Sequence, residues 1–149
     1  MKYCVFIILL SLLAGCGLWQ RQPEYQRNGI TFYDTDKNLL NSRNLTVMGN
    51  LNPEATDYFV ILATRGINTD YYQVQYITLR EILKEKNNFT VIHANSEWEV
   101  ADVPHTSVLT AKRLLGENTF RILVVDAAGQ ILEDASYALG KQRLSQQLQ

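Results

Sequence analysis

The chain has 149 residues, of which 46% are hydrophobic, and its formal net charge at pH 7 is -1. A chain of this length suits one folded domain with a single sizeable core. The near-balance of charges excludes the strongly basic character with which nucleic-acid-binding domains attract phosphates, so we expect no nucleic acid partner.

The first sixteen residues have the pattern of an export signal. Lys2 precedes an apolar segment over residues 5–13 that is too short to be a stable membrane span, and two small residues then lead to Cys16. The ending Leu12-Leu13-Ala14-Gly15-Cys16 resembles the lipobox of bacterial lipoproteins. This resemblance implies that residues 1–15 are cleaved off and that Cys16 is lipidated. The alternative is an ordinary secretory signal in which the cysteine stays free.

The lipobox resemblance also implies a location. Each buried methylene contributes about 0.8 kcal/mol, so several acyl chains on one cysteine anchor a protein almost permanently. We therefore expect the chain to be attached to a membrane of the bacterial cell envelope through Cys16. Gly17 follows it instead of Asp, which in enteric bacteria is typical of lipoproteins sent to the outer membrane, facing the periplasm. The polar, irregular residues 16–28 form the predicted anchor and tether.

The cysteine count excludes several kinds of chemistry. The sequence has two cysteines, Cys4 within the signal and Cys16 at the anchor. The folded part therefore has no thiol, although it is expected in an oxidising compartment. Disulfides, thiolate catalysis and cysteine-based metal or iron–sulfur sites are excluded there.

Residues 29–55 are predicted to form a β-rich extension. A strand at Ile30 to Phe32, a polar turn over 34–38 and Leu39-Leu40 suggest a short hairpin, and Leu45 to Leu51 suggests a further strand. Whether this extension joins the main sheet or forms a lid is left open by the sequence. The Asp34-x-Asp36 pair lacks the glycine and glutamate of a calcium loop, so we expect no calcium there.

The segment from Tyr58 to Lys86 predicts a buried strand followed by a helix. Tyr58 to Ala63 is a continuous apolar run, typical of a strand covered on both faces. Asn68, Thr69 or Asp70 can cap the next helix. Its predicted core-facing residues recur at intervals of four, three and four: Tyr72, Tyr76, Leu79 and Leu83, with Ile82 beside them. We interpret this as a tyrosine-rich core face and not as an aromatic ligand site.

The remaining elements complete the pattern. Phe89 to Ala94 predicts a second buried strand, parallel to the first, and an acidic loop over 95–105 follows. A short helix is expected from Thr110 to Leu115, ended by Gly116. A hairpin follows, with the turn Asp126-Ala127-Ala128-Gly129 between Phe120–Val125 and Gln130–Leu132. A final helix is predicted from Gly140 to Leu148.

This order of elements, βαβ followed by ββα over residues 56–149, resembles a thioredoxin-like domain. Within that superfamily it is similar to a poorly characterised group found in bacterial exported proteins and animal extracellular matrix proteins. The resemblance implies one α/β domain, in which helices flank a mixed central sheet, with the short β extension at its N-terminus. The loop over 64–70 lacks the Cys-x-x-Cys of thioredoxins, and no proline directly precedes Phe120. The chain is therefore not expected to be a thiol-disulfide oxidoreductase.

Two functions of different class remain. The first is a non-catalytic module that binds a protein or an envelope component without a cofactor, through loops 64–70 and 95–109. Arg65, Asn68, Glu97 and Trp98 are its candidate contact residues, because Trp and Arg often concentrate binding energy at interfaces. Trp98 could instead fold back as a plug of its loop.

The second function is an enzyme without a thiol, in which His93, His105 and Glu97 act on a substrate. The same residues, with Glu99 and Asp102, could also hold a metal ion. The sequence lacks the spacings His-x-x-x-His and His-Glu-x-x-His, however. His93 also lies in an apolar strand, where a hydrogen-bonded structural histidine is commoner, so we expect no metal site.

Overall fold

A computed structural model of the protein describes residues 28–30, 45–49, 56–67 and 69–149. The predicted export signal, Cys16, the 34–38 turn and Asn68 lie outside these residues. Among the helices that are described, none is both long and apolar enough to cross a membrane.

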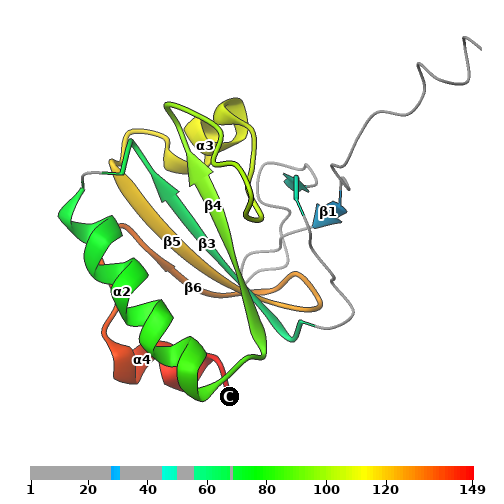
Figure 1. The fold of residues 1–149 in the computed structure, drawn as a ribbon, viewed down its shortest axis with the longest axis vertical. Coiled ribbons are helices and arrows are strands. Elements are labelled where there is room, and N and C mark those ends of the chain that lie inside the picture. The colour runs from blue at the N-terminus through cyan, green and yellow to red at the C-terminus, as the bar shows by residue number, and fades with distance from the viewer. Residues whose placement is uncertain (1–27, 31–44, 50–55, 68) are drawn as a thin grey trace, which may run out of the picture.

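The centre of the fold is a four-stranded mixed sheet (Figure 1). Its strands lie in the order β4 (Phe89–Asn95), β3 (Tyr58–Thr64), β5 (Phe120–Asp126) and β6 (Ile131–Ala135). The first two strands pair in parallel, as expected for strands joined through helix α2 (Asp70–Glu85), and β5 and β6 pair antiparallel. With α3 (Val108–Leu115) and α4 (Lys141–Gln147), this is the α/β arrangement, βαβ followed by ββα, that the sequence predicts.

Both faces of the sheet are buried, because β3 alternates its apolar side chains between two core clusters. Val60 and Leu62 pack with α2 and α4 on one face. Phe59, Ile61 and Ala63 pack with α3 on the other face. The continuous apolar run of this strand is therefore explained, as predicted, by cover on both sides.

The face that α2 buries differs from the one expected. The fully buried residues of this helix are Gln75, Leu79 and Ile82, whereas Tyr76 and Leu83 are 37% and 40% exposed. Gln75 is tolerated in the core because both ends of its amide are bonded to the backbone of Leu139. Its Nε2 donates to the carbonyl at 3.3 Å, and its Oε1 accepts from the N–H at 2.6 Å. The prediction of the core face was therefore wrong for Tyr76 and Leu83.

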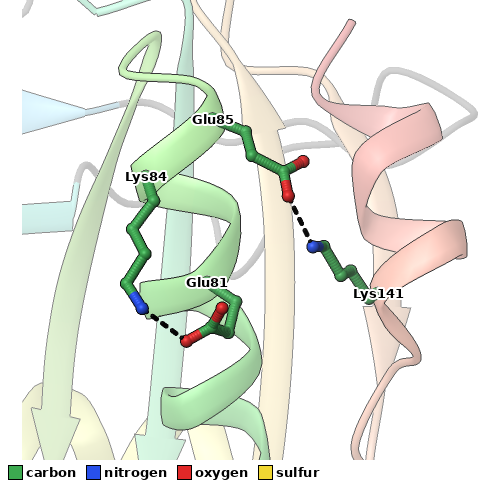
Figure 2. Close-up of polar contacts among 4 residues, drawn as sticks. All are labelled: Glu81, Lys84, Glu85 and Lys141. Atoms are coloured by element: carbon green, nitrogen blue, oxygen red, sulfur yellow. Dashed lines mark hydrogen bonds and ion pairs between the residues drawn. The ribbon is translucent and has the colours of Figure 1, made fainter.

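Helices α2 and α4 lie side by side on the same face of the sheet (Figure 1). Figure 2 shows the ion pair between them, Lys141 to Glu85 at 2.6 Å, and the Lys84–Glu81 pair within α2 at 2.8 Å. All four side chains are exposed, so water and salt screen these pairs and they contribute little to stability. The helices are held mainly by the buried leucines Leu79, Leu144 and Leu148.

The N-terminal extension forms a separate two-stranded sheet. Strand β1 (Asn28–Ile30) pairs antiparallel with β2 (Leu45–Val47). The predicted hairpin partner Leu39-Leu40 lies outside the described residues. Leu45 and Val47 are buried in the same core cluster as α3. Met48 and His105 exchange two backbone hydrogen bonds of 2.7 and 2.9 Å. The described part of the extension, β1 and β2, is therefore separate from the main sheet, and β2 packs on the α3 face of that sheet.

The C-terminal half follows the predicted pattern closely. Helix α3 begins at Val108, two residues earlier than expected, because Ser107 Oγ accepts from the N–H of Thr110. It ends at Gly116, whose positive φ of 57° suits glycine. In the β5–β6 turn, Asp126 Oδ1 accepts from two backbone N–H groups, and Gly129 has a φ of 86°. The Asp-x-x-Gly hairpin is confirmed.

Candidate functional site

The candidate site is a hollow at the end of the sheet toward which β3 and β4 run. Its volume is about 630 Å³, within the range typical of ligand sites. Helix α3 lies at this end of the sheet (Figure 1). We call this space the α3 hollow; its lining residues are Arg65, Ser96, Glu97, Val108, Lys112, Leu115 and Gly116.

Three elements contribute to the α3 hollow. Arg65 directly follows β3, and Ser96 and Glu97 directly follow β4. The carboxyl ends of parallel strands meet at one edge of a sheet, so the two loops lie close together. Helix α3 presents Val108, Lys112 and Leu115, which are spaced i, i+4 and i+7 and share one helical face.

The loop after β3 is fixed by hydrogen bonds from a buried threonine. Thr64 is 2% exposed, and its hydroxyl donates to the carbonyl of Gly66 at 2.7 Å and lies 3.2 Å from Thr69 Oγ1. Thr69 in turn caps α2 by accepting from the N–H of Tyr72. The N–H of Arg65 donates to Thr119 at 2.9 Å, which ties this loop to the start of β5. The backbone on which Arg65 sits is thus held on several sides.

The loop after β4 is hydrogen-bonded to the end of β3 and packs against the loop that follows it. Ser96 N–H donates to the carbonyl of Thr64, and Asn95 Oδ1 accepts from the N–H of Glu97 at 2.9 Å. Gly66 has a φ of 78°, and a Cβ added there would lie 3.0 Å from Glu97 Oε2. The carboxylate of Glu97 is therefore packed against the glycine of the neighbouring loop.

The charged groups of the α3 hollow are unpaired among the described residues. Arg65, Glu97 and Lys112 make no side-chain hydrogen bond or ion pair there, although Arg121, Arg143, Lys84 and Lys141 all have carboxylate partners. Ser96 is 7% exposed, and its hydroxyl also has no hydrogen-bond partner within the described part of the chain. Polar groups that converge on a hollow without internal partners are available to a ligand.

The structure brings together two of the four predicted contact residues. Arg65 and Glu97, from different loops, line the same hollow. Trp98 follows Glu97, and its side chain is 42% exposed, which is not the position of a loop plug. Ile67, two residues after Arg65 in the chain, is 46% exposed. Asn68 lies outside the described residues.

Sequence reasoning missed Lys112 and Ser96 as lining residues. Lys112 shares a helical face with Val108 and Leu115, but this spacing is visible only if the helix is predicted to begin at Val108. Ser96 carries no such signal, because only the pairing of β4 with β3 brings it to this edge of the sheet.

The two histidines meet at a different place, beside the outer edge of β4. His93 and His105 form an isolated bridge, and His93 is packed against the rings of Tyr72 and Tyr76 on α2. Tyr72 Oη lies 3.3 Å from His93 Nδ1. Burial, and then the nearby charge of His105, lower the pKa of His93 to about 4. This environment favours a neutral, hydrogen-bonded structural histidine, as expected for a histidine in an apolar strand.

The residues of the alternative enzyme or metal site do not assemble as a group. Glu97 lies in the α3 hollow against Gly66, whereas His93 lies under the tyrosines of α2. Among the described residues, no three His, Cys, Asp or Glu side chains come together in a manner that could hold a metal ion.

Comparisons with protein-family models and with characterised protein sequences found no match. Solved structures similar to this chain include the thioredoxin domain of a thiol-disulfide oxidoreductase from Bacteroides vulgatus, with a TM-score of 0.48 and 14% identity over 82% of this chain and 94% of that one. A peroxiredoxin-like protein from Aquifex aeolicus has a TM-score of 0.48 and 11% identity, covering 85% and 87%. The mitochondrial 2-Cys peroxiredoxin from Plasmodium falciparum has a TM-score of 0.41 and 9% identity, covering 84% and 89%.

Proposed function

We propose that this protein is a lipoprotein of the bacterial cell envelope whose thioredoxin-like domain binds a protein or an envelope component without catalysing a reaction. In this proposal Cys16 anchors the chain in the outer membrane, facing the periplasm. The α3 hollow and its neighbouring loops form the contact face. The anchor rests on the lipobox resemblance of residues 12–16.

The observation that carries the binding role is the meeting of Arg65 and Glu97 in one hollow. Both side chains were candidates from the sequence, and both are unpaired within the described residues. Trp98 and Ile67 follow them in the two loops as exposed apolar side chains. Exposed aromatic side chains and arginine are enriched at protein interfaces, which fits Trp98 and Arg65.

The absence of sulfur from these loops supports binding over redox chemistry. The segment 64–70 follows the first core strand, where thioredoxins carry their cysteines, and none of its residues is cysteine. A fold can keep its architecture while its site changes, because function resides in the side chains of the site.

A partner capture from detergent-solubilised membranes tests the binding role. The tagged, lipidated full chain is compared with its Arg65→Ala and Trp98→Ala variants. The matched controls are Arg113→Ala, an exposed arginine that lies outside the α3 hollow, and Tyr137→Ala, whose side chain is 49% exposed. We expect the enriched partner to be lost with the first pair and kept with the controls. If all four variants retain it equally, the proposed face is wrong.

The alternative is an enzyme that uses groups other than thiols, and one observation favours it: His93 and His105 do lie together. Zinc loading of the full chain distinguishes the two functions. Stoichiometric zinc that is lost in the His105→Ala variant would support the enzyme. No bound zinc after loading would remove the main argument for it.

A further inference from the structure

The charges of the α3 hollow define what it can accept. Arg65 comes from the loop after β3 and Lys112 from α3, so two cations from separate elements converge on one space. Neither has a carboxylate partner among the described residues, whereas the paired arginines Arg121 and Arg143 hold Asp134 and Glu133 at 2.7–2.9 Å. Arg and Lys together form a site for an anionic oxygen group, to which the planar guanidinium can bind in a bidentate manner.

Glu97 limits the anion to a weakly charged one. Its carboxylate is in the same hollow, so the three charged side chains sum to a single positive charge. A phosphate, with nearly two negative charges, would be repelled by Glu97, whereas a carboxylate matches the net charge. Glu97 can also accept a hydrogen bond from an N–H group, because the ionised carboxylate is purely an acceptor.

The remaining walls are aliphatic or weakly polar. Val108 and Leu115 line the hollow on the side of α3, and Ser96 supplies a hydroxyl without an internal partner among the described residues. The complementary ligand therefore combines a carboxylate, an adjacent N–H and an aliphatic side chain. The C-terminal residue of a peptide or protein has these three features.

We infer that the α3 hollow captures the C-terminal end of a polypeptide that finishes in an aliphatic residue. Arg65 and Lys112 hold the terminal carboxylate, Glu97 accepts the backbone N–H, and Val108 contacts the last side chain. This inference rests on the proposed binding function and names the chemistry of its partner. Chain ends captured through their carboxylates are a known mode of peptide recognition.

Titration calorimetry on the full chain in detergent micelles tests this inference with three synthetic peptides. The first is acetyl-Ala-Ala-Leu with a free carboxylate, and the second is the same peptide ending in an amide. The third, acetyl-Ala-Glu-Leu-amide, offers a carboxylate only on a side chain. We expect the free acid to bind at least tenfold more tightly than either amide. Equal binding by the second peptide would overturn the role of the carboxylate, and equal binding by the third would overturn the role of the chain end.

Substitutions then assign the effect to the hollow. Arg65→Gln and Lys112→Gln should each weaken binding of the free acid at least tenfold, and Arg113→Gln should leave it unchanged. Near-ultraviolet circular dichroism checks that each variant is folded. If no peptide binds, or if all three variants bind alike, the inference fails. The binding function survives that failure if the captured partner is still lost with Arg65→Ala and Trp98→Ala.

Discussion

Gln75 illustrates how a single polar residue can hold two distant elements together. Its side-chain amide is fully buried on α2 and makes both possible bonds to the backbone of Leu139, just ahead of α4. Such a pair of bonds replaces the water that both backbone groups lose on burial. A buried polar group that is left without its partner costs about 1–3 kcal/mol.

The Gln75→Ala substitution should therefore lower the free energy of unfolding by about 2–4 kcal/mol, since it leaves the N–H and carbonyl of Leu139 unpaired and opens a cavity. Urea denaturation followed by circular dichroism measures the change. Gln73→Ala, an exposed glutamine on the same helix, is the control and should have little effect. Similar losses from both substitutions would show that the paired bonds to Leu139 are unimportant.

His93 should make the stability of the fold depend on pH. Burial, and secondarily the charge of His105, lower its pKa from 6.5 to about 4, while Tyr72 and Tyr76 on α2 face it without adding an opposite charge. The unfolded chain then binds a proton more readily than the folded chain. The contribution of His93 to the free energy of unfolding is therefore fully present above pH 6.5 and is lost as the pH falls to about 4.

The loss attributable to His93 is on the order of 3 kcal/mol, from the size of its pKa shift. Urea midpoints at several values between pH 7 and pH 4 measure it. The His93→Gln variant, which keeps a polar side chain without the ionisation, should show a shallower fall than the wild-type protein. Parallel curves for the two proteins would mean that His93 does not control this dependence.

At the scale of the elements, the β1–β2 sheet is expected to be part of the folding unit. Val47 is fully buried in the cluster formed with α3 and the main sheet, while Thr46, between Leu45 and Val47, is exposed. Val47→Ala should therefore reduce global stability by about 2 kcal/mol, and Thr46→Ala should change it little. Urea unfolding of both variants checks this. If Val47→Ala leaves the transition unchanged, the extension packs too weakly to matter.

The elements differ in how far the sequence predicts them. Strand β3, strand β4 and the β5–β6 hairpin were predicted because their signals are local: continuous apolar runs, and an Asp-x-x-Gly turn. The buried face of α2 was not predicted, because Gln75 is stabilised by Leu139, a residue 64 positions away. The periodicity of the helix does not reveal such a contact. The pairing of β1 with β2 was missed for a similar reason, as it depends on contacts with His105 and α3.

The candidate site shows the same division. Arg65 and Glu97 were candidates because they lie in the loops 64–70 and 95–109, and because Arg is favoured at interfaces. Lys112 was missed because its position on the hollow depends on where α3 begins and how it lies on the sheet. The helical face that Lys112 shares with Val108 and Leu115 can be identified as a wall of the hollow only when the position of α3 on the sheet is known.

At the scale of the whole molecule, the proposed anchor can be tested independently of the binding face. Cys16→Ser removes the sulfur that would carry lipid, so the chain should move from the membrane fraction to the soluble fraction after cell breakage. A charge-neutral substitution in the predicted tether, Gln20→Ala, is the control and should stay with the membrane. Equal membrane association of the two variants would exclude Cys16 as the anchor.

The proposed function requires contact through the loops after β3 and β4. Site-specific photo-crosslinking in intact cells tests this requirement, with a photoreactive residue introduced at Ile67, whose side chain is 46% exposed, or, as the matched exposed position, at Tyr137 between β6 and α4. We expect a discrete crosslinked partner from position 67 and none from position 137. Crosslinks of equal yield from both positions, or none from position 67, would mean that these loops do not form the contact face.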